Sequence, residues 1–172
     1  FSGFGVDPIV SRLSSCNARA LIATTGFYRR GRHVDTIETI VEARKRLSLE
    51  LLVLKLGPNE VLTVPDAAEW SKVAAAVPPA GQQSARTTPH DPFMIIHTSG
   101  TAGKPKGTVH THGGFPLKIA HDSAVHFDIK AGDVFLWPAD MGWIAGALIV
   151  VSALVHGATM VCYDGAPDFP DW

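Results

Sequence analysis

The chain has 172 residues, enough to bury a hydrophobic core, and its 46% hydrophobic and 18% charged residues exclude an intrinsically disordered protein. Its formal net charge of −1 provides no broad positive field for nucleic acid or an anionic membrane, so any anion must be bound locally. Cys16 and Cys162 lie far apart and form no C-x-x-C pair, which favours a reducing cytoplasm over a disulfide scaffold.

Apolar periodicity in the first half predicts three helices that alternate with two short buried strands. The helices are expected at residues 7–16, 35–47 and 66–77, and the strands at 20–23 and 51–54. An aspartate opens each helix, followed by proline in the first and by a glutamate three residues later in the other two. The side chains expected to face inward include Ile9, Val10, Leu13, Ile40, Trp70, Val73 and Val77.

A polar loop over residues 78–92 could be a linker between domains or a short excursion before the next strand. Beyond it we expect strands at 94–98, 107–111, 134–137 and 159–163, with helices at 112–127 and 143–156. The last helix is apolar nearly all round but shorter than the roughly 20 residues that span a bilayer, so it should be buried in a core. This alternation predicts an α/β fold, with a layered, mostly parallel β-sheet flanked by helices.

The segment that follows the strand at 94–98 is rich in hydrogen-bond donors and positive charge. Glycines let backbone amides approach an anion closely, while hydroxyls and the ammonium groups of Lys104 and Lys106 suit a polyphosphate. It is not a Walker loop, because Lys104 is followed by Pro105 and a second strand replaces the helix. A phosphate-binding strand–loop–strand is therefore expected, with an ordinary hairpin connection as the alternative.

The run Thr98-Ser99-Gly100-Thr101-Ala102-Gly103-Lys104-Pro105-Lys106-Gly107 resembles the ATP-phosphate loop of the adenylate-forming (AMP-binding) superfamily. Five further segments resemble its acetyl-CoA synthetase branch: Trp137–Gly146, His156–Thr159 and Tyr163–Pro167, and upstream Phe1–Phe4 and Arg29–Arg32. The resemblance is tight from about His97 to Pro167. The resemblance implies that residues 1–172 are part of the large N-terminal domain of an acyl-CoA synthetase, truncated at both ends. A subdivision into 1–90, a CoA-cleft and sheet segment, and 91–172, the phosphate-loop segment, is possible.

The resemblance also implies a reaction and its sites. The full enzyme would join a carboxylate to CoA through an acyl-adenylate, using ATP with Mg²⁺, in the cytoplasm. No catalytic residue or metal ligand is expected within this chain, which should be inactive alone. The implied ATP-phosphate residues are Thr98, Ser99, Gly100, Thr101, Ala102, Gly103, Lys104 and Lys106. Those of the acyl and pantetheine pocket are Asp140, Trp143, Ile144 and Ala145, and those that bind CoA are Gly3, Arg29 and Arg32.

Two positions depart from the family pattern. Ala102 stands where a second hydroxyl residue is usual, and losing one hydrogen bond of about 0.5–1.5 kcal/mol should weaken ATP binding without abolishing it. Ala145 stands where acetate-specific members carry threonine, which favours a longer or bulkier acyl group.

Two alternatives remain open from the sequence. The chain could be a non-catalytic nucleotide-binding or interaction module that keeps the loop as structure only. The histidines could bind a metal: His110 and His112 share one face of a strand, and His121 and His126 follow on a helix. No carboxylate or cysteine pattern with zinc spacing is evident beside them, so a structural role and no metal site are expected.

Overall fold

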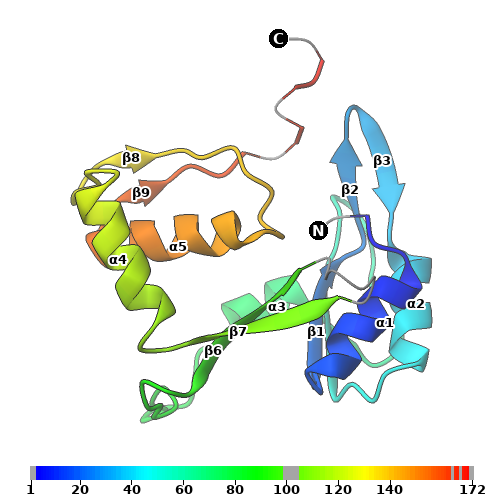
Figure 1. Ribbon diagram of the computed structural model, residues 1–172. Coiled ribbons are helices and arrows are strands. Elements are labelled where there is room, and N and C mark those ends of the chain that lie inside the picture. The colour runs from blue at the N-terminus through cyan, green and yellow to red at the C-terminus, as the bar shows by residue number, and fades with distance from the viewer. Residues whose placement is uncertain (1–2, 99–104, 164, 167, 171–172) are drawn as a thin grey trace. The chain divides into compact units, whose positions relative to one another are not determined.

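The computed structural model describes residues 3–98, 105–163, 165–166 and 168–170 (Figure 1). They divide into two compact units. One, here the sheet unit, comprises Phe4–Ser84 and Asp168–Trp172, and the other, here the loop unit, comprises Phe1–Gly3 and Ala85–Pro167. The α/β class expected from the sequence is confirmed, with parallel pairing in both units and antiparallel hairpins beside it.

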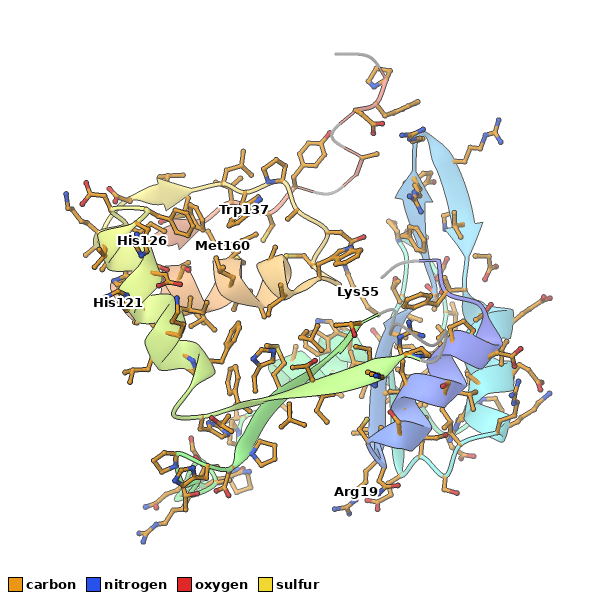
Figure 2. The ribbon with its side chains drawn as sticks, in the orientation of Figure 1. Arg19, Lys55, His121, His126, Trp137 and Met160 are labelled. Atoms are coloured by element: carbon orange, nitrogen blue, oxygen red, sulfur yellow. The ribbon has the colours of Figure 1, made fainter. Side chains whose placement is uncertain are left out.

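The sheet unit is built on a parallel three-stranded sheet in the order β1-β4-β5. Its strands are β1 (Ala20–Thr24), β4 (Leu51–Lys55) and β5 (Ala67–Glu69). The middle of the central strand β4 is apolar and buried, and Leu52, Val53 and Leu54 are at most 1% exposed. Arg19, labelled in Figure 2, pairs with Glu50 at 2.5 Å just before the two strands that begin side by side.

Three helices accompany this sheet: α1 (Val6–Ser15), α2 (Ile37–Lys45) and the short α3 (Trp70–Ala75). α1 and α2 lie side by side in Figure 1, and Arg46 just after α2 pairs with Asp7 in the first turn of α1 at 2.7 Å. Ile40 of α2 packs with Leu52 and Leu54 to form the core of the unit. As predicted, α2 therefore covers the sheet with its apolar side.

The hairpin of β2 (Gly26–Arg29) and β3 (Arg32–Asp35) was not predicted. Its turn residues Arg30 and Gly31 both have positive φ, 48° and 72°, the backbone of a two-residue type I′ turn. Arginine is an uncommon residue at the first position of such a turn, so the sequence lacked the usual Asn-Gly signal.

Residues 66–77 were wrongly predicted as a helix with an inward apolar stripe. Asp66 has a φ of +54°, and the following three residues form β5, which pairs in parallel with β4 from Leu52↔Ala67 to Leu54↔Glu69. Completing the backbone hydrogen bonds of β4 therefore outweighs the local capping pattern. The remaining helix α3 is short, and Trp70, Val73 and Val77 are 40%, 42% and 89% exposed.

Three finer expectations for the sheet unit also need correction. β1 is an edge strand rather than a buried one, and Ile22 is 61% exposed. α1 begins at Val6 with Gly5 as its N-cap, so Asp7 lies inside the first turn. α2 has Thr36 at its N-cap, while the Asp35 carboxylate accepts the Ile37 amide hydrogen at 2.8 Å.

The loop unit contains two strand pairs and two helices. β6 (Pro92–Thr98) and β7 (Lys106–Thr111) form an antiparallel hairpin, and β8 (Val134–Phe135) and β9 (Thr159–Met160) form a short parallel pair. The helices are α4 (Phe115–Val125) and α5 (Ile144–His156). β8 and β9 are shorter than predicted, because their pairing covers only two residues in each strand.

Helices α4 and α5 pack against each other through apolar and polar contacts. Ile119 of α4 is 6% exposed, and Ile149 and Ala153 of α5 are each 2% exposed. Between them the hydroxyls of Ser123 and Ser152, both fully buried, form a hydrogen bond of 2.6 Å. His156 Nε2 donates a hydrogen to the carbonyl of Ala120 at 3.0 Å, closing the C-terminal end of α5 onto α4.

The prediction that α5 is buried all round is wrong for the described chain. Its one covered face carries Ile149 and Ala153, whereas Leu154 is 77% and Val155 is 52% exposed. Val125, the last residue of α4, is 63% exposed. No helix of the described residues combines the length and apolar composition needed to cross a bilayer.

A small polar cluster holds the start of the β2–β3 hairpin against the sheet. The buried hydroxyl of Thr25 donates a hydrogen bond to the Glu60 carboxylate, which also accepts the Gly57 amide hydrogen at 3.0 Å. The hydrogen bond from Thr25, and then that from Gly57, lower the pKa of Glu60. Ionised Glu60 therefore stabilises the folded state.

We predict that Glu60→Gln lowers the free energy of unfolding at pH 7, because the charged acceptor is lost. Since the pKa of Glu60 is lower in the folded state, its contribution is complete above the ordinary glutamate pKa of about 4.3 and disappears as the pH falls below it. Urea unfolding followed by circular dichroism between pH 3 and 7 measures this. Glu42→Gln, which removes only an exposed ion pair with Lys45, should follow the wild type, and a pH-independent loss in Glu60→Gln would contradict the prediction.

Candidate functional site

The β6–β7 hairpin forms the stem of the expected phosphate loop. Its register pairs Thr98 with Lys106 and His97 with Gly107, so the two strands are joined from their paired ends by residues 99–105. The prediction of strand–loop–strand, rather than strand–loop–helix, is confirmed. Thr98 and Lys106 are exposed and directly opposite each other, which places a hydroxyl and an ammonium group together where the loop begins.

Six of the predicted phosphate-binding residues lie outside the described part of the chain. They are Ser99, Gly100, Thr101, Ala102, Gly103 and Lys104. Their contacts with phosphate, and the consequence of alanine at position 102, stay predictions.

Glycine at position 107 leaves room for side chains of the paired strand. A Cβ there would lie 2.9 Å from Cγ2 of Ile95 and 3.3 Å from Nε2 of His97, both on β6. The first distance is shorter than real Cβ contacts allow, so a side chain at position 107 would require the side chain of Ile95 to move.

An apolar groove of about 410 Å³ lies in the same unit, between β6 and the N-terminal half of α5. Its walls come from β6, the connection before α5, and α5 itself. The lining residues are Phe93, Met94, Ile96, Met141, Trp143, Gly146, Ala147, Val150 and Val151. The groove can accept an apolar group beside β6, the strand that leads into the expected phosphate loop.

Gly146 lets the connection before α5 cross close to the helix. A Cβ at this position would lie 2.5 Å from the carbonyl oxygen of Met141 and 2.6 Å from its Cα. Because these are backbone atoms, the clash could not be relieved by a side-chain rotation. Glycine here therefore fixes how Met141 and Trp143 are presented to the groove.

Of the four residues predicted for the acyl and pantetheine pocket, only Trp143 lines this groove. Trp143 is the N-cap of α5 and is 61% exposed, and Ile144, the first helical residue, is 42% exposed. Ala145 is half-buried in the first turn. The Asp140 carboxylate accepts the Gly142 amide hydrogen at 2.7 Å, which forms a turn before the helix rather than a side-chain cap.

The predicted CoA-binding arginines lie on the β2–β3 hairpin of the sheet unit. Arg29 and Arg32 are directly opposite in its register and exposed, so their side chains share one face. The guanidinium group of neither residue forms a hydrogen bond or ion pair with another residue that the structure describes. Like charges held opposite each other are destabilising, and an anion bound between them would relieve the repulsion.

The sequence did not predict how the turn between these arginines is held. Arg30 pairs with Asp168, and a Cβ at Gly31 would lie 2.8 Å from the ring of Phe169. The chain near residue 168 therefore packs on the hairpin tip and engages Arg30. Gly3, the third predicted CoA-binding residue, belongs to the loop unit, has a φ of 124° and is exposed.

Comparison with known proteins gives the family. The family described as AMP-binding enzyme matches residues 1–172, the whole chain. The chain belongs to the AMP-binding enzyme family.

Proteins similar to this chain include two acetyl-coenzyme A synthetases and an acetoacetyl-CoA synthetase. The AMP-binding chain is 35% identical to an acetyl-coenzyme A synthetase of Pyrobaculum aerophilum and 36% identical to one of Methanothrix thermoacetophila. Each alignment covers 99% of this chain and 26% of the relative. A solved structure of acetoacetyl-CoA synthetase from Streptomyces lividans matches with a TM-score of 0.87 and 28% identity, covering 98% of this chain and 26% of that one. The AMP-binding chain thus spans about a quarter of the length of these relatives.

We predict that Gly146→Ala destabilises the loop unit by about 1–3 kcal/mol, because the added methyl group overpacks against the backbone of Met141. The intrinsic helix preference for alanine acts in the opposite direction and is smaller, about 1 kcal/mol. Chemical denaturation followed by circular dichroism measures the change. Gly5→Ala is the matched control, because no atom lies within 4 Å of its added Cβ. A Gly146→Ala variant as stable as the wild type would contradict the required close approach.

Proposed function

We propose that this chain is part of the N-terminal adenylation domain of an ATP-dependent, AMP-forming acyl-CoA synthetase. The observation that carries the proposal is the family match over residues 1–172 together with the β6–β7 hairpin that bears the loop sequence. The names of the relatives, acetyl- and acetoacetyl-CoA synthetase, support a short acyl group as substrate. The free thiols of Cys16 and Cys162 support a cytoplasmic location.

In this proposal the loop binds the β- and γ-phosphates of ATP. Thr98 and Lys106, exposed at the top of the stem, supply a hydroxyl donor and an ammonium group, and Ser99–Lys104 supply the rest. Mg²⁺ bound with ATP would offset phosphate charge, and no residue of this chain is proposed as its ligand. The loop acts by positioning and charge stabilisation, and none of its residues forms a covalent bond with substrate.

The reaction has two steps. In the first, a carboxylate oxygen attacks the α-phosphorus of ATP, and the bond from phosphorus to the bridging oxygen breaks to give acyl-AMP and pyrophosphate. In the second, the thiolate of CoA attacks the acyl carbon, and AMP leaves to give the thioester. Holding the reacting groups in one geometry is the main contribution expected of the protein.

The acyl group is proposed to lie against the start of α5. Trp143 lines the apolar groove beside β6, and Ala145 follows in the first helical turn. Because alanine occupies less volume than threonine and has no hydroxyl, the site should favour an acyl group longer than acetyl. Comparing the kcat/KM of a series of acids in the full-length enzyme addresses this.

The proposed function is tested by carboxylate-dependent exchange of labelled pyrophosphate into ATP, with the full-length protein. We expect exchange that requires a short or medium-chain acid, and formation of the thioester when CoA is added. Lys106→Ala should lower the exchange rate, because it removes a positive charge at the loop, whereas Lys72→Ala, on α3, should leave it unchanged. Nucleotide binding without exchange for any acid would instead indicate a non-catalytic binding module.

We predict that Arg29→Ala or Arg32→Ala raises the KM for CoA and leaves pyrophosphate exchange unaffected. The paired guanidinium groups are proposed to bind a phosphate of CoA. Steady-state kinetics with varied CoA measures this. Arg19→Ala, which removes an exposed arginine paired with Glu50 instead, is the control. An unchanged KM for CoA in both hairpin variants would contradict the assignment.

A further inference from the structure

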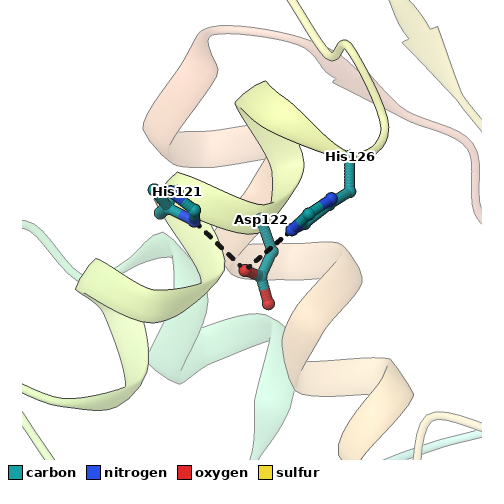
Figure 3. A group of neighbouring side chains, drawn as sticks. All are labelled: His121, Asp122 and His126. Atoms are coloured by element: carbon teal, nitrogen blue, oxygen red, sulfur yellow. Dashed lines mark hydrogen bonds and ion pairs between the residues drawn. The ribbon is translucent and has the colours of Figure 1, made fainter.

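A cluster of three potential metal ligands lies at the C-terminal end of α4. None of the three belongs to the candidate ATP, acyl or CoA sites. Figure 3 shows His121, Asp122 and His126 with their polar atoms directed toward one another. His121 Nδ1 lies 3.3 Å, and His126 Nε2 lies 3.9 Å, from the same Asp122 oxygen, Oδ1. All three ligand atoms lie within 4.8 Å of one another.

The two separations from Asp122 are close to those of a zinc site. Zinc binds imidazole nitrogen and carboxylate oxygen at about 2.0–2.2 Å, so neighbouring ligand atoms of a tetrahedral site are about 3.4 Å apart. His121 Nδ1 and Asp122 Oδ1 already have this spacing. The distance between His126 Nε2 and Asp122 Oδ1 is longer, and a small rotation of a side chain would shorten it to the required value. Both imidazoles are free to make that adjustment, because the side chains of His121 and His126 are 65% and 64% exposed.

The carboxylate is held in position by a neighbour on the same helix. Lys118, one helical turn earlier, forms an ion pair with Oδ2 of Asp122, which leaves Oδ1 directed toward the histidines. The side chain of Asp122 is only 22% exposed, so it is better fixed than either imidazole.

The local fold explains why Asp122 and His126 lie close together. Asp122 and His126 are four residues apart, which places them on one face of the helix, and His126 is the residue that ends α4. Its backbone amide hydrogen is donated to the carbonyl of Asp122 at 2.8 Å, so the spacing of the two residues is fixed by the last helical turn. Figure 2 shows His121 and His126 on this one helix, and the rings lie edge to face with centroids 6.0 Å apart.

We propose that His121, Asp122 and His126 bind one zinc ion, with water completing its coordination. Two imidazoles and a carboxylate suit zinc, whereas magnesium prefers a shell of oxygen ligands. This zinc site is therefore distinct from the place where Mg²⁺ would bind together with ATP. No metal site was expected from the sequence, where no carboxylate with zinc spacing was evident beside the histidines; in the folded chain Asp122 supplies the carboxylate. The proposal does not depend on the proposed enzymatic function.

The ammonium group of Lys118 sets an upper limit to the affinity. It lies on the second oxygen of the same carboxylate and repels a divalent cation, so binding in the micromolar range is expected rather than the tight binding of a structural zinc. Lys118→Gln keeps all three ligands and removes this charge. It should therefore bind zinc at least as tightly as the parent protein.

The test is isothermal titration calorimetry of the chelator-treated full chain with zinc alone. Cys16 and Cys162 are first replaced by serine, because free thiols also bind zinc. We expect one zinc ion per chain, and His121→Gln and His126→Gln should each raise the Kd by at least about tenfold, since even outer-shell partners of a metal contribute 10- to 100-fold. His90→Gln, an exposed histidine in the loop before β6, is the matched control and should bind as the parent does.

Cobalt provides a second, spectroscopic measurement. Its visible absorption should show nitrogen and oxygen ligation in the parent protein and should be lost in His121→Gln and His126→Gln, with circular dichroism confirming that the variants fold. The proposal is overturned if zinc does not bind at micromolar concentrations, or if the variants at positions 121 and 126 bind zinc as the parent does. An equal loss in His90→Gln would also overturn it, because the ion would then be held elsewhere.

Discussion

The antiparallel pairing of β6 with β7 is the constraint on which the candidate nucleotide site depends. Pairing of Thr98 with Lys106 brings the two ends of the segment 99–105 together. Gly107, which has no side chain, leaves room for the side chain of Ile95 on the paired strand. The apolar groove beside β6 belongs to the same unit, so the walls proposed for acyl binding and for phosphate binding share one strand.

The proposed anion site of the sheet unit is formed by a tight turn between two strands. A two-residue turn with positive φ at Arg30 and Gly31 places Arg29 and Arg32 opposite each other, where their charges repel. Arg30 is directed to Asp168 instead, so the three guanidinium groups do not share one role. The folded hairpin thereby retains unfavourable electrostatic energy that a bound phosphate can relieve, which is how binding sites commonly differ from the rest of a fold.

The sequence predicted best those elements whose signal is local and strong. The apolar run Leu52–Leu54 became the buried central strand, and the long apolar run after Trp143 became α5. The sequence pattern predicted the wrong element where the structure depends on backbone that is distant in sequence. β5 forms because β4 offers hydrogen-bonding partners, and residues 66–69 contain no local sign of these partners. The histidine cluster was missed for a related reason. Asp122 was not considered as a ligand, since its orientation depends on the ion pair with Lys118.

The hydroxyl pair of Ser123 and Ser152 has a consequence for how α5 can respond to a ligand at its first turn. Apolar side chains tolerate small sliding of one helix along another, but two buried hydroxyls satisfy each other at one axial position only. Moving α5 by a turn would leave both groups without a partner in the core, at a cost of about 1–3 kcal/mol for each. A ligand bound at the proposed acyl site would therefore be accommodated by the exposed end of α5, while the helix itself keeps its register on α4.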